Sequence, residues 1–575
     1  MNAAMWMGRA GHVGHADDRR GWRFARAGAR TLGLAFLVVA SEGASGGEGV
    51  RPSSDACAEL AAQPGEQARG EQPSGEAGRQ PKADRRPSVA EQTLDRQRLV
   101  WLQQHVSELA TVDFSSEELG DLESIGRAIG NARVVLLGSA TPGDGGAFQL
   151  KARLVKYLHQ RRGFDVLAFE SSFFDMDRVD RAMESDATWN LAAERGLAPT
   201  WAQSEQCRPL LEYVRASRQT GEPLRLAGID CQFTTPLGKS EVWDEIERFF
   251  LAADGVMDGR MAELLTRLKV WHMERGFMDE VRVRDESEMT DEQLAAMREV
   301  SEQVAKQLKE YLENLDALVA AIDADLAKPR PSLTRVHPAR RVVFMRQTLR
   351  NLKAATIDKV LGKGKARTDP SDINLRDRAM GENVHWLASV RYPDRKIIVW
   401  ASSAHVVRRV RRISVEDRPG YFDKKDTMGD VVADRLGAEA YAIGVTAAEG
   451  STGRPWTDAK PLDGAARGSL EWLMSRAGFG LGFLDLRGEH APTPGATRAL
   501  IEEPLIARPI GYGAMQAVWS ECLDGVLFMK TMTPSTQAKL PLPPTEPGKA
   551  PEAKQEEAGN EASPRPQGER RGPRP

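Results

Sequence analysis

Residues 134–143 read VVLLGSATPG, and this stretch decides the fold. Four apolar residues stopped by Gly138 predict a short buried strand. Residues 147–162 then repeat apolar side chains at helical spacing, and Gly163 ends that helix. Residues 165–170 form a second apolar run. A strand, a helix and a strand in this order predict a parallel pair joined by a right-handed crossover.

Further apolar runs continue this pattern along the chain. They predict strands at residues 224–229, 396–400, 441–445, 482–486 and 526–529. Helical patterns lie between them. The predicted fold class is therefore α/β, with a mostly parallel central sheet flanked by helices on both faces.

One long segment, at about residues 241–357, contains no convincing strand. Its clearest part begins with a capping-box pattern at Thr290 and continues with an apolar seam from Leu294 to Ile322. We expect a helical subdomain inserted into the α/β core, as a wall or lid over the active-site end. A coiled-coil contact between two copies is the alternative, although the seam lasts only about four heptads.

Both ends of the chain have compositions that do not build a core. Arginines followed by a short apolar run and small residues predict that residues 1–44 are a signal peptide. The protein would then be exported, with no membrane span after cleavage; an uncleaved anchor is the alternative. Residues 45–91 and the proline-rich residues 541–575 bury too little apolar surface to order, so they are predicted to be a disordered linker and tail. Residues 92–540 remain as the folded domain.

Charge and cysteine content exclude several classes of function. The net charge is −3, without the basic stripe that a nucleic-acid backbone needs, so no nucleic-acid partner is predicted. The nine histidines are scattered and the four cysteines lack CxxC spacing, so no metal site is predicted. In an exported protein Cys207 and Cys231 could form a disulfide. Buried free thiols, Cys522 included, are the equally open alternative.

Polar residues follow the predicted strands at the ends where a parallel sheet binds its ligands. Glu170 ends one strand, Asp230 follows the next, and Ser402 and His405 follow the strand at residues 396–400. The loop that starts at Ser139 follows the first strand. Chain order alone therefore predicts a shared site at one rim of the sheet.

Five motifs on these segments together resemble the erythromycin esterase family. They are GSATPG (138–143), GFDVLAFE (163–170), AGID (227–230), RDRAMGEN (376–383) and VWASSAH (399–405). With shorter later matches, the resemblance covers roughly residues 115–532. It implies hydrolysis of a macrolide lactone by a water that histidine and carboxylate groups activate, without a required metal.

Four positions of the family's pattern carry other residues in this chain. The first motif usually reads Gly-Glu-x-x-His, and here its glutamate is Ser139 and its histidine is Pro142. An arginine expected nine residues beyond that histidine corresponds to Lys151. The later motif usually reads Ala-His-Asn-Ala-His, and its first histidine is Ser402. The retained positions are Glu170, Arg376 and His405.

These replacements remove groups that the implied chemistry needs. A positioned general base contributes about 10²- to 10⁴-fold, and Pro142 has neither a side-chain proton acceptor nor a backbone N–H. Ser139 is not ionised near neutral pH, and Lys151 lacks the planar fork of arginine. The sequence therefore predicts a degenerate site, in a binding protein or weak hydrolase for a small ester or lactone. Its catalytic candidates are Glu170 and His405, and its predicted substrate-binding residues are Arg376, Lys151, Asp230, Ser139 and Ser402.

Other interpretations stay open. Glu170 and His405 could form an acid/base pair in an active ester or lactone hydrolase, with Ser402 as a nucleophile that lacks the Gly-x-Ser-x-Gly elbow. They could equally be a structural ion pair. The chain could also be an envelope-associated protein that makes contacts through its tails. The glycine-rich residues 138–146 lack the Gly-Lys-Ser/Thr of a phosphate-binding loop, so no cofactor is predicted.

Overall fold

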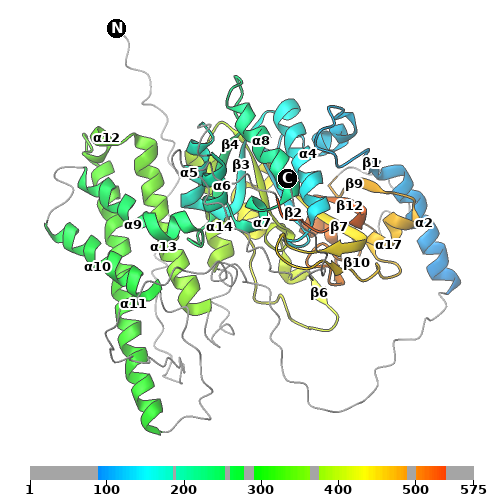
Figure 1. The fold of residues 1–575 in the computed structure, drawn as a ribbon. Coiled ribbons are helices and arrows are strands. Elements are labelled where there is room, and N and C mark those ends of the chain that lie inside the picture. The colour runs from blue at the N-terminus through cyan, green and yellow to red at the C-terminus, as the bar shows by residue number, and fades with distance from the viewer. Residues whose placement is uncertain are drawn as a thin grey trace, which may run out of the picture.

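The computed structural model of the chain describes residues 88–184, 189–252, 259–276, 291–362, 375–487, 500 and 502–538 (Figure 1). The predicted signal peptide, the predicted tail and nearly all of the predicted linker lie outside these residues. At the end of the linker segment, helix α2 (Val89–His105) already begins. Ser88 and Glu91 form a capping box there, because each side chain accepts a hydrogen bond from the other residue's backbone N–H, at 3.2 and 2.7 Å.

A nine-stranded sheet forms the centre of the domain. Its parallel part has the spatial order β12 (Gly525–Met532), β7 (Ala440–Thr452), β2 (Val134–Ser139), β5 (Lys396–Ser402), β3 (Phe164–Ser172) and β4 (Arg225–Asp230). The antiparallel strands are β9 (Leu481–Asp485) beside β12, β1 (Ser107–Glu108) beside β9, and β8 (Lys460–Pro461) beside β7. The predicted mostly parallel sheet is confirmed, and every predicted strand is present.

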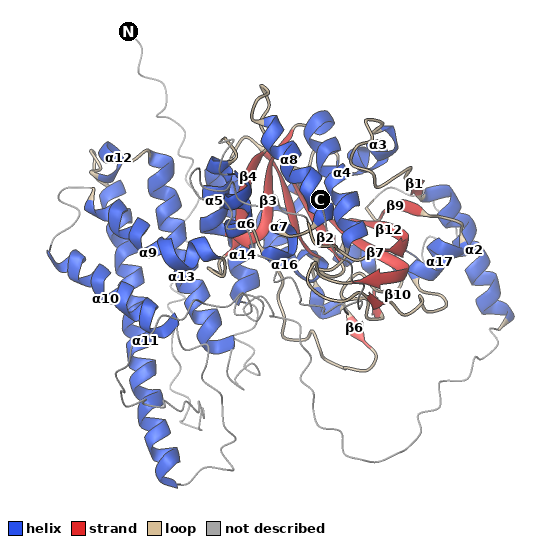
Figure 2. Ribbon diagram, viewed as in Figure 1, coloured by secondary structure: helices blue, strands red, loops and turns tan. Residues whose placement is uncertain are grey.

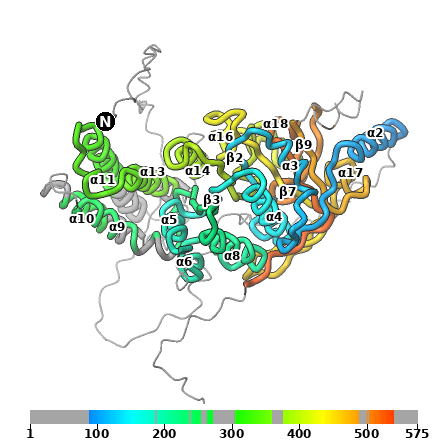
Figure 3. The backbone as a smooth tube through the Cα atoms, turned by 90° about the horizontal axis from the view of Figure 1, so that it is seen from above, coloured from blue at the N-terminus to red at the C-terminus, as the bar shows by residue number. Residues whose placement is uncertain are grey.

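Helices cover both faces of the sheet (Figure 3). One face carries α4 (Gly145–Arg162) and α8 (Arg208–Ser217), and the other carries α14 (Leu375–Trp386) and α16 (Met428–Leu436). Along β2, Leu137 packs on the α4 side and Leu136 on the α14 side. Both faces are buried, which is why this strand has a continuous apolar run instead of an alternating pattern. Gly163 ends α4 with a left-handed φ of 68°, as predicted.

The inserted helical subdomain lies beside the β4 end of the sheet (Figures 1 and 2). Its helices are α9 (Pro236–Leu251), α10 (Gly259–Gly276), α11 (Asp291–Leu326), α12 (Leu333–Val336) and α13 (Ala339–Gly362). It therefore begins about five residues earlier than predicted. The capping box predicted at Thr290 lies outside the described residues. Leu315, Leu318 and Ile322 on α11 are buried in one core with residues of α13, so this part of the seam is covered within the chain and is not available to a coiled-coil partner.

Short elements complete the domain. A three-stranded antiparallel sheet consists of β10 (Leu505–Ala507), β11 (Met515–Ala517) and β6 (Ser414–Val415). The remaining α-helices are α3 (Glu123–Ile129), α5 (Phe173–Ala182), α6 (Trp189–Gly196), α7 (Pro199–Ala202), α15 (Ser403–Val406), α17 (Leu470–Arg476) and α18 (Trp519–Cys522). None of the helices described here has the length and apolarity that crossing a membrane requires.

Candidate active site

The predicted site residues lie along the carboxyl ends of four neighbouring parallel strands. Ser139 ends β2, Ser402 ends β5, Asp230 ends β4, and Glu170 lies two residues before the end of β3. His405 lies in α15, which follows β5 directly. In a parallel sheet these ends share one edge, so the rim predicted from chain order is the rim that the topology builds.

Arg376, in the first turn of α14, joins two of these carboxylates. Its Nη2 donates to Glu170 Oε1 at 2.9 Å and to Asp230 Oδ2 at 2.8 Å. Its Nε donates to the other Asp230 oxygen, Oδ1, at 3.2 Å, so the contact with Asp230 is bidentate. All three side chains are less than one-fifth exposed. The guanidinium therefore occupies the space between the carboxylates that a cation would otherwise take.

His405 lies between two carboxylates. Its Nδ1 is 2.7 Å from Asp377 Oδ1, and its Nε2 is 3.2 Å from Glu170 Oε1. Burial by itself lowers the pKa of His405, but the charges of Asp377 and Glu170 more than offset burial and raise that pKa to about 10. His405 is accordingly an imidazolium at neutral pH.

The same charges act on Glu170. Burial alone would raise the pKa of this carboxyl, but His405, Arg376 and the Ser402 N–H together hold it well below its ordinary value. The Ser402 N–H donates to Glu170 Oε2 at 2.9 Å. Glu170 is therefore a fully ionised acceptor with three partners and has little tendency to take up a proton.

Asp377 was not among the residues predicted for the site. It also accepts a hydrogen bond from the backbone N–H of Met428 at 3.1 Å, which links α14 to α16. The sequence feature that could have identified Asp377 as a site residue is its position directly after Arg376. Adjacent helical residues do not usually share a target, which is why the pair was not recognised. Here Arg376 contacts both Glu170 and His405, so the two neighbours converge on one cluster.

Two of the four replaced positions are direct neighbours across the sheet. Ser139 on β2 is paired in register with Ser402 on β5. Ser139 is 2% exposed. The glutamate and the histidine expected at these positions would therefore have been adjacent, and both charges that the family pattern places there are missing together.

Pro142 lies in the loop between β2 and α4, and this loop is closed by its own contacts. The buried Asp144 carboxylate accepts hydrogen bonds from the Thr141 N–H at 2.7 Å and from the Thr452 hydroxyl at 2.8 Å. A Cβ on Gly145 would lie 2.3 Å from the Pro534 carbonyl oxygen, so close backbone approach explains this glycine. The glycine-rich pattern thus serves packing, and the Asp144 carboxyl accepts the Thr141 N–H, a kind of group that a phosphate-binding loop leaves free for its ligand.

Lys151, on α4, is fully buried below the rim. Its Nζ donates to the Ala401 carbonyl oxygen at 3.0 Å and lies 4.3 Å from the centre of the Trp400 ring. Burial lowers the pKa of Lys151 to about 7, against the weaker attraction of Glu170. Its hydrogen bond thus goes to the backbone of β5 and not to the carboxylate cluster. Among the predicted site residues, the structure brings Glu170, Asp230, Arg376, His405 and the Ser402 backbone into one network, and leaves Lys151 and Ser139 on its border.

Two other predictions concern serine and cysteine chemistry. Both ring nitrogens of His405 face charged groups, so neither is directed at the Ser402 hydroxyl in this arrangement. Cys207, Cys231 and Cys522 are buried and free, so the disulfide between Cys207 and Cys231 is wrong. The reason is their location, because Cys207 packs in the core on the α4 face whereas Cys231 follows β4 beside Asp230. Across the described segments, no group of three or more histidine, cysteine, aspartate or glutamate side chains is arranged to hold a metal ion.

Comparisons with known proteins identify a family and relatives for this chain. The family model described as erythromycin esterase matches residues 159–532. A protein of Bacillus subtilis (strain 168), named "Putative hydrolase YbfO", is 26% identical over 455 residues, which cover 76% of this chain and 92% of that protein.

Solved structures with the same fold include a Bacillus cereus protein with a TM-score of 0.57 and 19% identity, covering 77% of this chain and 99% of that one. A mutant of the erythromycin esterase EreC in its open conformation has a TM-score of 0.54 and 16% identity, with coverage of 75% and 98%. A succinoglycan biosynthesis protein matches similarly, with a TM-score of 0.56 and 17% identity, covering 77% of this chain and 99% of that one.

Proposed function

The chain belongs to the erythromycin esterase family, and from this premise we propose that it binds a small ester or lactone at the rim and hydrolyses it weakly or not at all. The observation that carries the proposal is the clustering of the replacements. Ser139, Pro142 and Lys151 all lie on β2, its loop and α4, and Ser402 is the direct partner of Ser139. This side carries neither the glutamate nor the two histidines of the family pattern, while the opposite side has a connected ionic network.

The retained side is suited to binding and poorly suited to activating water. A general base must be unprotonated, but His405 carries its proton up to about pH 10. Glu170 is held ionised by its partners and is a weak base. Both ring nitrogens of His405 are taken by Asp377 and Glu170, and the Nε and Nη2 of Arg376 by Asp230 and Glu170. The donor that remains is the Nη1 of Arg376, which could polarise a carbonyl oxygen. A ligand carbonyl would thus be held without a nucleophile being generated opposite it.

The decisive experiment compares binding with turnover and then attempts repair. We expect the purified protein to bind a macrolide lactone or a simple ester in calorimetry, with hydrolysis near background by mass spectrometry. The variant Ser139→Glu, Pro142→His, Lys151→Arg, Ser402→His reinstates the four groups, and we expect it to gain hydrolysis by about 10²-fold or more, the usual contribution of a positioned base. The same variant with Glu170→Gln is the matched control and should lose the gain.

The proposal fails if the unmodified protein turns over an ester at the rate of an ordinary esterase and Glu170→Gln abolishes that activity. It also fails if no ester or lactone of a macrolide panel binds to the folded protein. A serine-directed phosphonate that modified Ser402 or Ser139 would favour a covalent hydrolase instead.

A further inference from the structure

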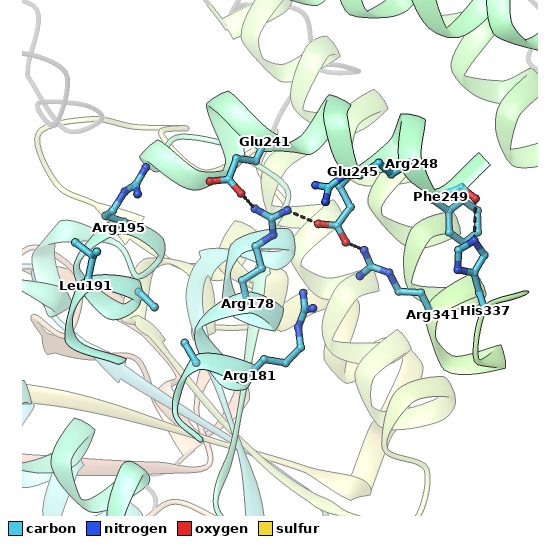
Figure 4. Close-up of a pocket in the computed structure, with 12 residues that line it drawn as sticks. Arg178, Arg181, Leu191, Arg195, Glu241, Glu245, Arg248, Phe249, His337 and Arg341 are labelled. Carbon is cyan, nitrogen blue, oxygen red and sulfur yellow. Dashed lines mark hydrogen bonds and ion pairs between the residues drawn. The ribbon is translucent and has the colours of Figure 1, made fainter. Parts of the chain in front are cut away.

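A second concave site lies between the α/β core and the helical subdomain (Figure 4). Its volume is about 620 Å³, and its walls come from α5, α6, α9 and α13. It is distinct from the rim described above. Asp180, in the last turn of α5, contacts Arg225 and the Leu226 N–H at the beginning of β4, whereas the candidate active site lies at the opposite end of that strand. The two sites therefore face opposite ends of the sheet.

Guanidinium groups dominate the lining of this pocket. The charged residues of the lining are Arg178, Arg181, Arg195, Arg248, Arg341, Glu241 and Glu245. Five arginines against two glutamates leave an excess of three positive charges. Glu245 is shared between Arg178 and Arg341, and Glu241 also binds Arg178, as Figure 4 shows.

The next layer of charges does not remove this excess. Asp177 is the carboxylate behind the pocket, and it is shared by three arginines, at 3.1 Å from Arg181, 3.1 Å from Arg391 and 3.7 Å from Arg341. Counting this layer adds one arginine, Arg391, and one carboxylate, so the excess stays at three. Burial and the neighbouring guanidiniums, acting against the pull of Asp177, together lower the pKa of Arg341 to about 10. Among the residues that the structure describes, the cluster is therefore short of negative charge.

The rest of the lining is apolar or aromatic. Leu191 is 53% exposed on α6, and Phe249 on α9 stacks on His337 with ring centroids 4.4 Å apart. The Nε2 of His337 donates to the Phe249 carbonyl oxygen at 2.8 Å, which fixes the ring against this wall. A pocket of this size accommodates a small organic molecule, and apolar surface beside a cationic end favours a ligand that carries both kinds of group.

We propose that this pocket binds a small organic molecule through a phosphate or pyrophosphate group held by Arg195, Arg248 and the Arg178–Arg341 pair. Arginine is suited to this because its planar fork matches phosphate oxygens bidentately. Arg195 and Arg248 are exposed, and Figure 4 shows Arg195 beyond Glu241 and Arg248 beside Glu245. The bound anion supplies the charge that Glu241, Glu245 and Asp177 leave uncompensated.

The test uses inorganic pyrophosphate as the probe, titrated calorimetrically into the full-length protein at low and at moderate salt. We expect saturable binding of one pyrophosphate per chain, weakened by salt because the pocket is open to solvent. The double variant Arg195→Gln, Arg248→Gln should bind at least about tenfold more weakly, since the loss of even one charge-assisted contact costs roughly a factor of ten. Both side chains are exposed, so the fold should tolerate the change.

Arg350→Gln is the matched control. Arg350 is exposed on the same helix as Arg341 but nine residues later, which places it about 13 Å along α13 and on the opposite face. It should bind pyrophosphate like the unmodified protein. Equal affinity in the double variant, or no saturable binding to the unmodified protein, would overturn the proposal. Sedimentation with phosphatidic acid vesicles in the absence of pyrophosphate binding would also overturn it, in favour of a membrane surface. Ester binding at the rim should be unchanged in the double variant, so the two proposals can fail separately.

Discussion

The charge state of His405 can be tested by removing the nearer of its two carboxylates with Asp377→Asn. The pKa of His405 is raised from 6.5 to about 10. At about 1.36 kcal/mol per pH unit, this corresponds to about 5 kcal/mol of differential interaction with the charged ring. Asp377 lies at 2.7 Å and Glu170 at 3.2 Å, so Asp377 supplies at least half of it. We expect Asp377→Asn to lower the pKa of His405 by about two pH units.

The direct assay is an NMR titration of the protein with ¹³C-labelled histidine, in which the His405 signal is identified by its absence in His405→Gln. Unfolding by urea gives a second readout. Because the folded pKa lies above the unfolded value, the stabilisation is complete below about pH 6.5 and is lost as the pH rises towards 10. The free energy of unfolding of Asp377→Asn should therefore fall below that of the unmodified protein by about 3 kcal/mol at pH 6 and by roughly half as much at pH 9.

Titration of groups outside this cluster cancels in this difference. Asp434→Asn, at an exposed carboxylate on α16, is the control and should change neither readout. The reasoning is refuted if His405 titrates near pH 6.5 in the unmodified protein, or if its pKa is the same with and without the Asp377 charge. In that case His405 would be neutral at pH 7 and available as a base, and the argument for a site that binds without activating water would lose its chemical ground.

Three further perturbations follow from buried groups. Lys151→Met should stabilise the protein by roughly 1–3 kcal/mol at pH 6 and by less at pH 10. The pKa of Lys151 is about 7 in the folded state, so the penalty for burying the ammonium is complete below pH 7 and fades as the pH rises towards the unfolded pKa. A gain in the urea midpoint that is equal at both pH values would contradict this. Gly138→Ala places a Cβ 2.7 Å from the Ser403 Cα and should cost about 1–3 kcal/mol in thermal unfolding, whereas Gly464→Ala, with no neighbour within 4 Å, should cost little. In a Cys57→Ser variant, the three buried thiols should resist a thiol reagent in the native protein and all react after denaturation; one reactive thiol would indicate a disulfide.

The fold was predictable from the sequence wherever a strand is long enough to need a continuous apolar run. Five of the parallel strands are buried on both faces, and each is therefore a nearly continuous apolar run: β2, β3, β4, β5 and β7. The strands of the small sheet could not be found in this way. β6, β10 and β11 are two or three residues long, so no period can be recognised in them.

The rim was predictable for the same topological reason, because the ends of parallel strands share an edge. The contacts on that rim were not predictable. Asp377 reaches His405 only because α14 returns to the sheet after the helical insertion, and no local pattern encodes that return. The pairing of Ser139 with Ser402 likewise depends on the register of β2 against β5.

The division of the site into a changed side and a retained side has a physical explanation that does not require catalysis. Arg376, Glu170 and Asp230 tie α14 to β3 and β4, and removing Arg376 leaves the buried Asp230 carboxylate without its cation, at a cost of about 3–5 kcal/mol. Ser139 and Ser402 are neighbours, and both are neutral, so no unpaired charge is left between them. Selection for stability alone would therefore preserve the ionic network, whether or not the protein hydrolyses an ester. For this reason the retained Glu170 and His405 cannot by themselves argue for activity, and the repaired variant, which adds the missing side to an intact network, is the experiment that separates the two roles.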